Sequence, residues 1–129
     1  MTKSSKENKS YSVTFEHRPG YLYAYGKAVK DSFEISLGFW TEIAAHCKAN
    51  NFSKVLVEED FETDNEILDT YEIVSQGHKV GFTRVKIAFV DRHNSQMNNN
   101  LFGETVARNR GILGRVFPNV EEAEKWLLS

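Results

Sequence analysis

The chain has 129 residues, enough for one domain of ordinary size and too few for two. Hydrophobic residues make up 40% of it and aromatic residues 12%, so it can form a hydrophobic core and does not have the composition of a disordered protein. The formal net charge of −2 gives no reason to expect binding to nucleic acid.

The composition also bears on where the protein resides. The single cysteine, Cys47, excludes an internal disulfide and fits a reducing compartment. Residues 1–9 are charged and show no periodicity, so we predict a disordered tail before one domain over residues 10–129. These residues also lack the apolar segment of a secretory signal. No apolar run approaches the roughly 20 residues of a membrane-spanning helix. We therefore expect a cytoplasmic protein without a membrane span.

The N-terminal part of the domain predicts a β-hairpin. Apolar and polar residues alternate from Tyr11 to Glu16, as in a strand with one buried face. Arg18-Pro19-Gly20 is typical of a turn, and the residues from Tyr21 to Val29 predict a second strand.

A helix and a strand are predicted next. Asp31 and Glu34 have the spacing of a capping box, in which the first residue accepts hydrogen bonds from first-turn amides. Apolar residues recur at helical spacing as far as Asn50-Asn51. The buried stripe of this helix comprises Phe33, Leu37, Trp40, Ile43, Ala44 and Cys47. Lys54 to Glu58 is a short run of β-forming residues, typical of a strand covered on both faces.

The second half of the chain continues to alternate helix and strand. A helix is predicted over about 66–76, a strand over 85–91, and a helix that ends at Gly111. A last strand over 112–117 precedes a helix opened by Asn119. The inward residues of the 66–76 helix are predicted to be Ile67, Leu68, Tyr71 and Val74. The order ββαβαβαβα predicts a single α/β domain with a four- to five-stranded, mainly parallel sheet after an N-terminal hairpin.

Several segments resemble one group of small α/β domains. They are GYLYAYG from Gly20, KVLVE from Lys54, VKIAFVD from Val85 and the C-terminal stretch ETVARNRGILGRVFPNVEEAEKWL. Together they resemble the STAS superfamily, the anti-sigma-factor-antagonist-like domains, and within it the small stand-alone bacterial branch of SpoIIAA-like proteins. The resemblance covers the chain from about Tyr11 onward. It implies helices mostly on one side of the sheet, and a role in protein interaction or ligand sensing rather than catalysis.

The same resemblance points to one candidate phosphorylation site. STAS domains commonly carry the phosphorylated serine or threonine in a D-S-S-G-type motif, at the start of the helix after the central strand. The matching stretch here is Asp60-Phe-Glu-Thr63-Asp-Asn65, which lacks the motif and leaves Thr63 as the candidate. A phosphate on Thr63 gains from the helix N-terminus but is repelled by neighbouring acids. The departure argues against a retained phosphorylation switch.

The stretch from Glu58 to Glu72 carries eight carboxylates and no base. As a calcium-binding EF-hand loop counted from Asp60, it fails at the two positions that set the geometry. Asn65 replaces the glycine and Tyr71 replaces the bidentate glutamate. As a helix, its later acids share the outer face. The sequence therefore favours a solvated charged face, and we predict no metal and no cofactor.

The ends of two predicted strands supply a sharper candidate site. In a parallel sheet the C-terminal strand ends open onto the crevice where ligands usually bind. The candidates are Glu58, Glu59 and Asp60 after one strand, and Asp91, Arg92 and His93 after another. If these ends are neighbours, their side chains can hold a metal or serve in acid–base chemistry. The alternative is that polar residues simply enter loops.

Tyr21, Tyr23 and Tyr25 lie at strand spacing and therefore on one face of the sheet. Such a stripe usually packs under a helix. Left open, it is a ready interaction surface, because tyrosine gives much contact area at low entropic cost. We take this stripe as the preferred interaction surface. By contrast, Cys47 falls on a buried stripe and is expected to be an inert core thiol.

Three hypotheses about function follow. The first is a non-catalytic regulatory or interaction module that binds a protein partner or itself. The second is a small-molecule- or lipid-binding domain with an apolar pocket between the first helix, around Trp40, and the sheet. The third is a metal-dependent or acid–base enzyme that uses the strand-end carboxylates and His93, for which the sequence contains no recognised catalytic motif.

Overall fold

The computed structural model describes residues 10–62, 67–93 and 96–129. Within these ranges five strands form one sheet in the order β1-β2-β3-β4-β5. β1 (Tyr11–Arg18) and β2 (Tyr21–Ala28) form the predicted antiparallel hairpin. β3 (Lys54–Phe61), β4 (Lys86–Asp91) and β5 (Leu113–Phe117) add to β2 in parallel. The predicted tail over residues 1–9 and the candidate Thr63 lie outside the described residues.

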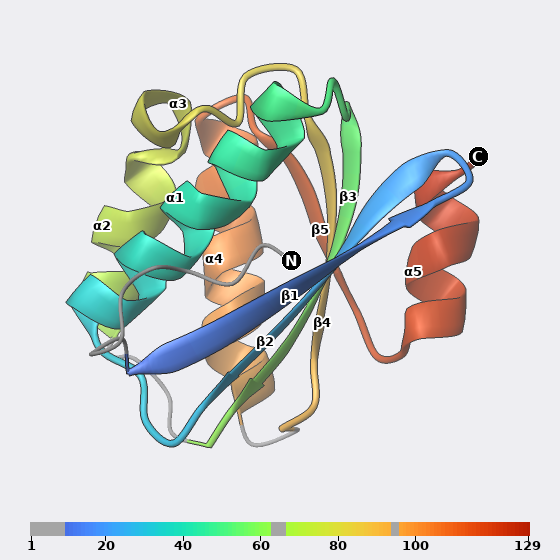
Figure 1. Cartoon of the computed structure of the whole chain (residues 1–129). Coiled ribbons are helices and arrows are strands. Elements are labelled where there is room, and N and C mark those ends of the chain that lie inside the picture. The colour runs from blue at the N-terminus through green and yellow to red at the C-terminus, as the bar shows by residue number, and fades with distance from the viewer. Residues whose placement is uncertain (1–9, 63–66, 94–95) are drawn as a thin grey trace.

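The helices divide unequally between the two faces of the sheet (Figure 1). α1 (Phe33–Ala49), α2 (Ile67–Ser75), the single turn α3 (Gly77–Val80) and α4 (Met97–Asn109) lie on one side. α5 (Val120–Leu127) lies alone on the other. The predicted element order and the one-sided arrangement are confirmed, with α3 as an additional short element.

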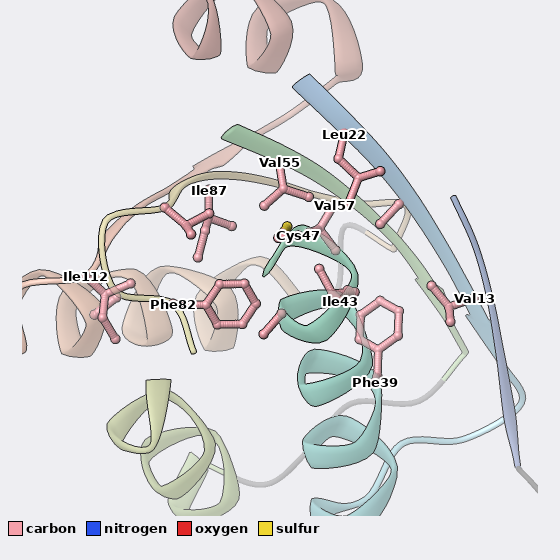
Figure 2. Close-up of a cluster of buried hydrophobic side chains, with 14 of the residues drawn as sticks. Val13, Leu22, Phe39, Ile43, Cys47, Val55, Val57, Phe82, Ile87 and Ile112 are labelled. Atoms are coloured by element: carbon pink, nitrogen blue, oxygen red, sulfur yellow. The ribbon is translucent and has the colours of Figure 1, made fainter. Parts of the chain in front are cut away.

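Each face of the sheet carries its own hydrophobic core. The larger core packs α1 against the sheet, and Figure 2 shows Phe39 and Ile43 of α1 facing strand residues such as Val57. The smaller core lies under α5 and comprises Tyr21, Leu56, Ala88, Val90, Phe117, Ala123 and Leu127. Successive residues of a strand point to opposite faces. The strands therefore contribute side chains to both cores.

Three predicted features of single residues are confirmed. Asn119 caps α5, with its Oδ1 accepting a hydrogen bond from the backbone N–H of Glu122 at 2.9 Å. Gly111 follows α4 with φ +77°, the left-handed conformation that favours glycine. Cys47 is buried in the larger core (Figure 2), where burial raises the pKa of its thiol to about 11.

The predicted cap of α1 was wrong by one residue. Ser32 is the N-cap, because its Oγ accepts the hydrogen bond from the Ile35 amide at 3.2 Å. Asp31 instead accepts from the Ser32 amide at 2.8 Å and from the Ser36 hydroxyl at 2.7 Å. Aspartate and serine are both good caps, and the extended backbone at Ser32 decides between them.

The predicted inner face of α2 was correct for Val74, which packs against the larger core, and wrong for Leu68 and Tyr71. Leu68 and Tyr71 are exposed, at 77% and 40% respectively, whereas Ile73 is buried at 8%. The helix packs largely against α4, where Gly103 of α4 lies close to Thr70 and Val74. Because α4 and not the sheet is its main neighbour, α2 turns a different stripe inward from the one that the apolar spacing indicated.

β3 is three residues longer than predicted. Glu58 to Phe61 remain in the sheet because they pair with Tyr25 to Ala28, the second half of β2. Charged residues had indicated a loop after Glu58. They instead occupy strand positions, and this extension places their side chains in the site described next.

Candidate functional site

The sheet face that carries α5 also carries a cluster of polar side chains beside the smaller core. Leu56, Glu58 and Asp60 share this face by strand alternation, as do the three tyrosines of β2. Tyr21 is covered by α5 and is only 1% exposed. The cluster comprises Tyr23, Tyr25, Glu58, Asp60, Arg92 and His93, and we call it the tyrosine–carboxylate cluster.

Glu58 is held from two sides. The Tyr23 hydroxyl donates a hydrogen bond to its Oε1, and Arg92 Nε donates to its Oε2 at 2.7 Å. Glu58 is 7% exposed, so this ion pair offsets the cost of a carboxylate placed away from water. Half of the Arg92 side chain remains in solvent, at 52% exposed.

Asp60 repeats the arrangement two residues along the strand. The Tyr25 hydroxyl donates to its Oδ2 at 2.8 Å, and His93 Nε2 lies 2.8 Å from its Oδ1. The Arg92 guanidinium lies over the Tyr25 ring, 5.1 Å from the centroid, and so connects the two halves of the cluster.

The electrostatics follow from these contacts. The hydrogen bonds from Tyr25 and then His93 hold the pKa of Asp60 below its ordinary value. Burial, followed by the hydrogen bond to a carboxylate, raises the pKa of Tyr23 and of Tyr25. The hydrogen bond to Glu58 raises the pKa of Arg92. Asp60 is therefore held as an anion, and the two tyrosines as neutral donors.

The expected convergence of strand ends is correct for one set of residues and wrong for Asp91. Asp91 points to the opposite face, because it follows Val90 of the α5-side core by one residue. There its Oδ1 accepts from the His93 amide at 2.9 Å and its Oδ2 accepts from Asn100 Nδ2 at 2.8 Å. Glu59, its register partner on β3, shares that face and is also buried. Polar residues at strand ends thus divide between the two faces.

Sequence reasoning missed Arg18, which extends the cluster at the hairpin. Its guanidinium lies 4.0 Å from the centroid of the Tyr23 ring, and its Nη1 donates to the Tyr21 hydroxyl at 3.2 Å. The sequence contained the information needed to find Arg18, because a tight turn at Pro19-Gly20 makes Arg18 and Tyr21 register partners.

A pocket lies on the other side of the sheet, bordered by α1, α2 and α4, with a volume of about 160 Å³. Trp40 lines it as predicted, with its ring packed against Phe82 and Phe89. Further apolar lining residues are Leu37, Ile73, Val74, Ile87, Ala107 and Ile112. Polar groups also reach it, among them Ser36, Glu59, Thr70 and Asn100. The contributions of α2 and α4 were not foreseen, because they depend on how those helices pack together.

Neither site has the donor set of a tightly bound metal. Across residues 10–62, 67–93 and 96–129, no three His, Cys, Asp or Glu side chains are grouped closely enough to hold an ion. In the same ranges, no helix combines the length and apolar character needed to cross a membrane.

Comparison with known proteins supports the fold. No protein-family model matches the chain, and no curated protein matches it. The crystal structure of an uncharacterized protein from the DUF3478 family, with a SpoIIAA-like fold, from Shewanella loihica PV-4 is similar to it, with a TM-score of 0.56 and 15% sequence identity. The match covers 96% of this chain and 98% of that chain. This chain therefore has a SpoIIAA-like fold, as its sequence resemblance implied.

Proposed function

We propose that this chain is a non-catalytic binding module of SpoIIAA-like fold, and that its pocket between α1, α2, α4 and the sheet takes a small, mainly apolar molecule. The observation that carries the proposal is the apolar pocket of about 160 Å³ beside Trp40. An apolar protein cavity of about 150 Å³ is large enough to bind benzene. A ring-sized molecule therefore fits, with the polar lining groups to orient it.

The non-catalytic part of the proposal rests on how the carboxylates are used. Both oxygens of Glu58 accept hydrogen bonds, and so do both oxygens of Asp60 and of Asp91. The donors of these hydrogen bonds are tyrosine, arginine, histidine and asparagine side chains and one backbone amide, all of which act as structural donors here. This arrangement supports acids that join neighbouring elements rather than acids that exchange protons with a substrate.

The pocket is tested with a probe and a filling substitution. Binding of benzene and of indole is measured by ligand-observed NMR and calorimetry on the purified chain. Ala107→Leu places extra side-chain volume at a buried lining position. We expect it to weaken binding at least tenfold while the chain stays folded, since a filled cavity does not cost stability.

The matched control makes the same exchange elsewhere. Ala45→Leu lies on the exposed side of α1 and leaves the pocket intact. Binding unchanged in Ala107→Leu, or lost equally in Ala45→Leu, contradicts a pocket ligand. Native mass spectrometry of the protein as purified then reports the mass of any natural occupant.

A second candidate function is protein binding at the tyrosine–carboxylate cluster. The observation in its favour is composition: Tyr23 and Tyr25 are partly exposed and lie beside Arg18 and Arg92, and tyrosine and arginine dominate interface hot spots. Sedimentation velocity over a range of concentrations measures self-association. Arg92→Glu replaces the half-exposed guanidinium of the cluster with a carboxylate and should abolish any dimer, while Lys48→Glu, on an exposed part of α1, should not.

A further inference from the structure

Two histidines from different elements meet away from both sites described above. His17 of the edge strand β1 and His46 of α1 place their Nε2 atoms 2.9 Å apart. The two nitrogens are closer than the ring centroids, which are 5.2 Å apart, so the nitrogens face one another. His17 is exposed and His46 is half-buried, which leaves the pair open to solvent.

Aromatic neighbours hold both imidazole rings in place. The Phe15 ring stacks on His46, with centroids 4.0 Å apart and planes 9° apart. Phe52 packs edge-on against His17 at 4.9 Å. The convergence of the two nitrogens is therefore built by packing, and it does not depend on their own hydrogen bond alone. Preorganised ligands of this kind lose little entropy when they bind an ion.

The separation suits metal coordination. Imidazole nitrogens bind divalent transition metals at about 2.0–2.1 Å. Two nitrogens 2.9 Å apart subtend about 90° at an ion placed at that distance from each, the cis angle of octahedral and square-planar ions, once both rings turn from one another toward the ion. Tetrahedral zinc needs about 3.3 Å between the nitrogens, a shift of a few tenths of an ångström.

The surrounding charges also favour a cation. Glu42 lies one helical turn before His46, and its Oε1 accepts a hydrogen bond from the Tyr11 hydroxyl at 2.9 Å.

We propose that His17 and His46 form a binding site for a divalent transition metal ion of the zinc, nickel or copper type. The two imidazoles are its protein ligands and solvent fills the remaining positions, because the described residues offer no third grouped ligand. Such a site exchanges its ion readily, unlike a closed structural site. A bound ion ties the edge strand β1 to α1.

The test uses the full chain without a histidine tag. Calorimetry with ZnCl₂ and with NiCl₂ should show that each wild-type chain binds one metal ion. His17→Gln and His46→Gln should each weaken binding at least tenfold, whereas His93→Gln, on the other face of the sheet, should leave it unchanged. MgCl₂ should not bind, because oxygen-seeking ions gain little from imidazole.

A second measurement locates the ion without substitution. In the NMR spectrum of the wild type, paramagnetic Ni²⁺ should broaden the resonances of His17 and His46 before those of His93. The proposal is overturned if the double variant His17→Gln/His46→Gln binds zinc as tightly as the wild type. It is equally overturned if the broadening centres elsewhere in the chain.

Discussion

Tyr23 and Tyr25 each reach diagonally across to an acid on β3, two positions beyond their register partners. Tyrosine has the length for a diagonal contact of this kind, which a shorter hydroxyl side chain lacks. The result is a pair of carboxylates fixed within a strand, where charged residues are ordinarily unfavourable. The tyrosine stripe, which was predicted to be an interaction surface, therefore also donates hydrogen bonds to carboxylates within the sheet.

Asp60 provides a prediction about pH. Its pKa is lowered in the fold by hydrogen bonds from Tyr25 and His93, so its stabilising contribution is present above its ordinary value of 3.8. The contribution is lost as the pH falls from that value through the lower pKa of the folded state. Asp60→Asn should cost about 1.5–3 kcal/mol at pH 7, the range for hydrogen bonds to a charged group.

Urea unfolding from pH 7 to pH 3 checks this prediction. The difference in free energy of unfolding between wild type and Asp60→Asn should shrink at the acid end. Glu72→Gln, which removes an exposed carboxylate of α2, should have little effect at neutral pH. An Asp60→Asn difference that stays constant across the whole range would contradict the assignment.

At the scale of the element, close packing decides where a residue type is required. Gly26 of β2 lies under α1, and a Cβ built there would be 2.2 Å from the Phe39 ring. Phe39 is fully buried and packs against Tyr11, Trp40 and Phe61, so it has no room to move away. The glycine therefore sets how closely α1 approaches the sheet.

Gly26→Ala should destabilise the chain by about 1–3 kcal/mol, because the added methyl overpacks the larger core. Gly114→Ala is the matched control in β5, where the nearest atom to a new Cβ is the Ile87 carbonyl oxygen at 3.9 Å. Chemical denaturation of both variants measures the difference. Equal effects of the two substitutions would show that the approach of α1 is not limited by Gly26.

At the scale of the whole molecule, a single sheet supports two cores of unequal size. Tyr21 and Leu22 are adjacent in β2, yet Tyr21 packs under α5 and Leu22 packs with α1. Lys86 of β4 also fastens α5, with its Nζ donating to the Trp126 carbonyl at 2.8 Å. Because α5 has only eight residues, it is too short to be stable without the sheet.

The two tryptophans allow a test of cooperativity, since Trp40 reports on the larger core and Trp126 on the smaller. The single-tryptophan variants Trp126→Phe and Trp40→Phe should each unfold in one transition. Within each variant, the midpoint by fluorescence should coincide with the midpoint by circular dichroism. A fluorescence midpoint in Trp40→Phe that precedes loss of secondary structure would mean that the α5 layer unfolds independently.

Most of the architecture could be predicted from local patterns. Alternation identified the hairpin, helical spacing identified α1 and α5, and Asn119 and Gly111 marked helix boundaries. These features depend on the periodicity and backbone preferences of neighbouring residues, which a sequence displays directly. The sequence also placed Trp40 at a pocket and proposed that Glu58, Asp60, Arg92 and His93 converge.

The tertiary structure alone decided which partners those residues meet. β3 extends through its charged residues because β2 continues beside it, and α2 turns Ile73 inward because α4 is its neighbour. Asp91 leaves the cluster because one residue of strand alternation reverses its face. Local sequence determines what an element is. Which of its sides is buried depends on neighbours that are distant in the sequence, and their positions are fixed only when the chain has packed.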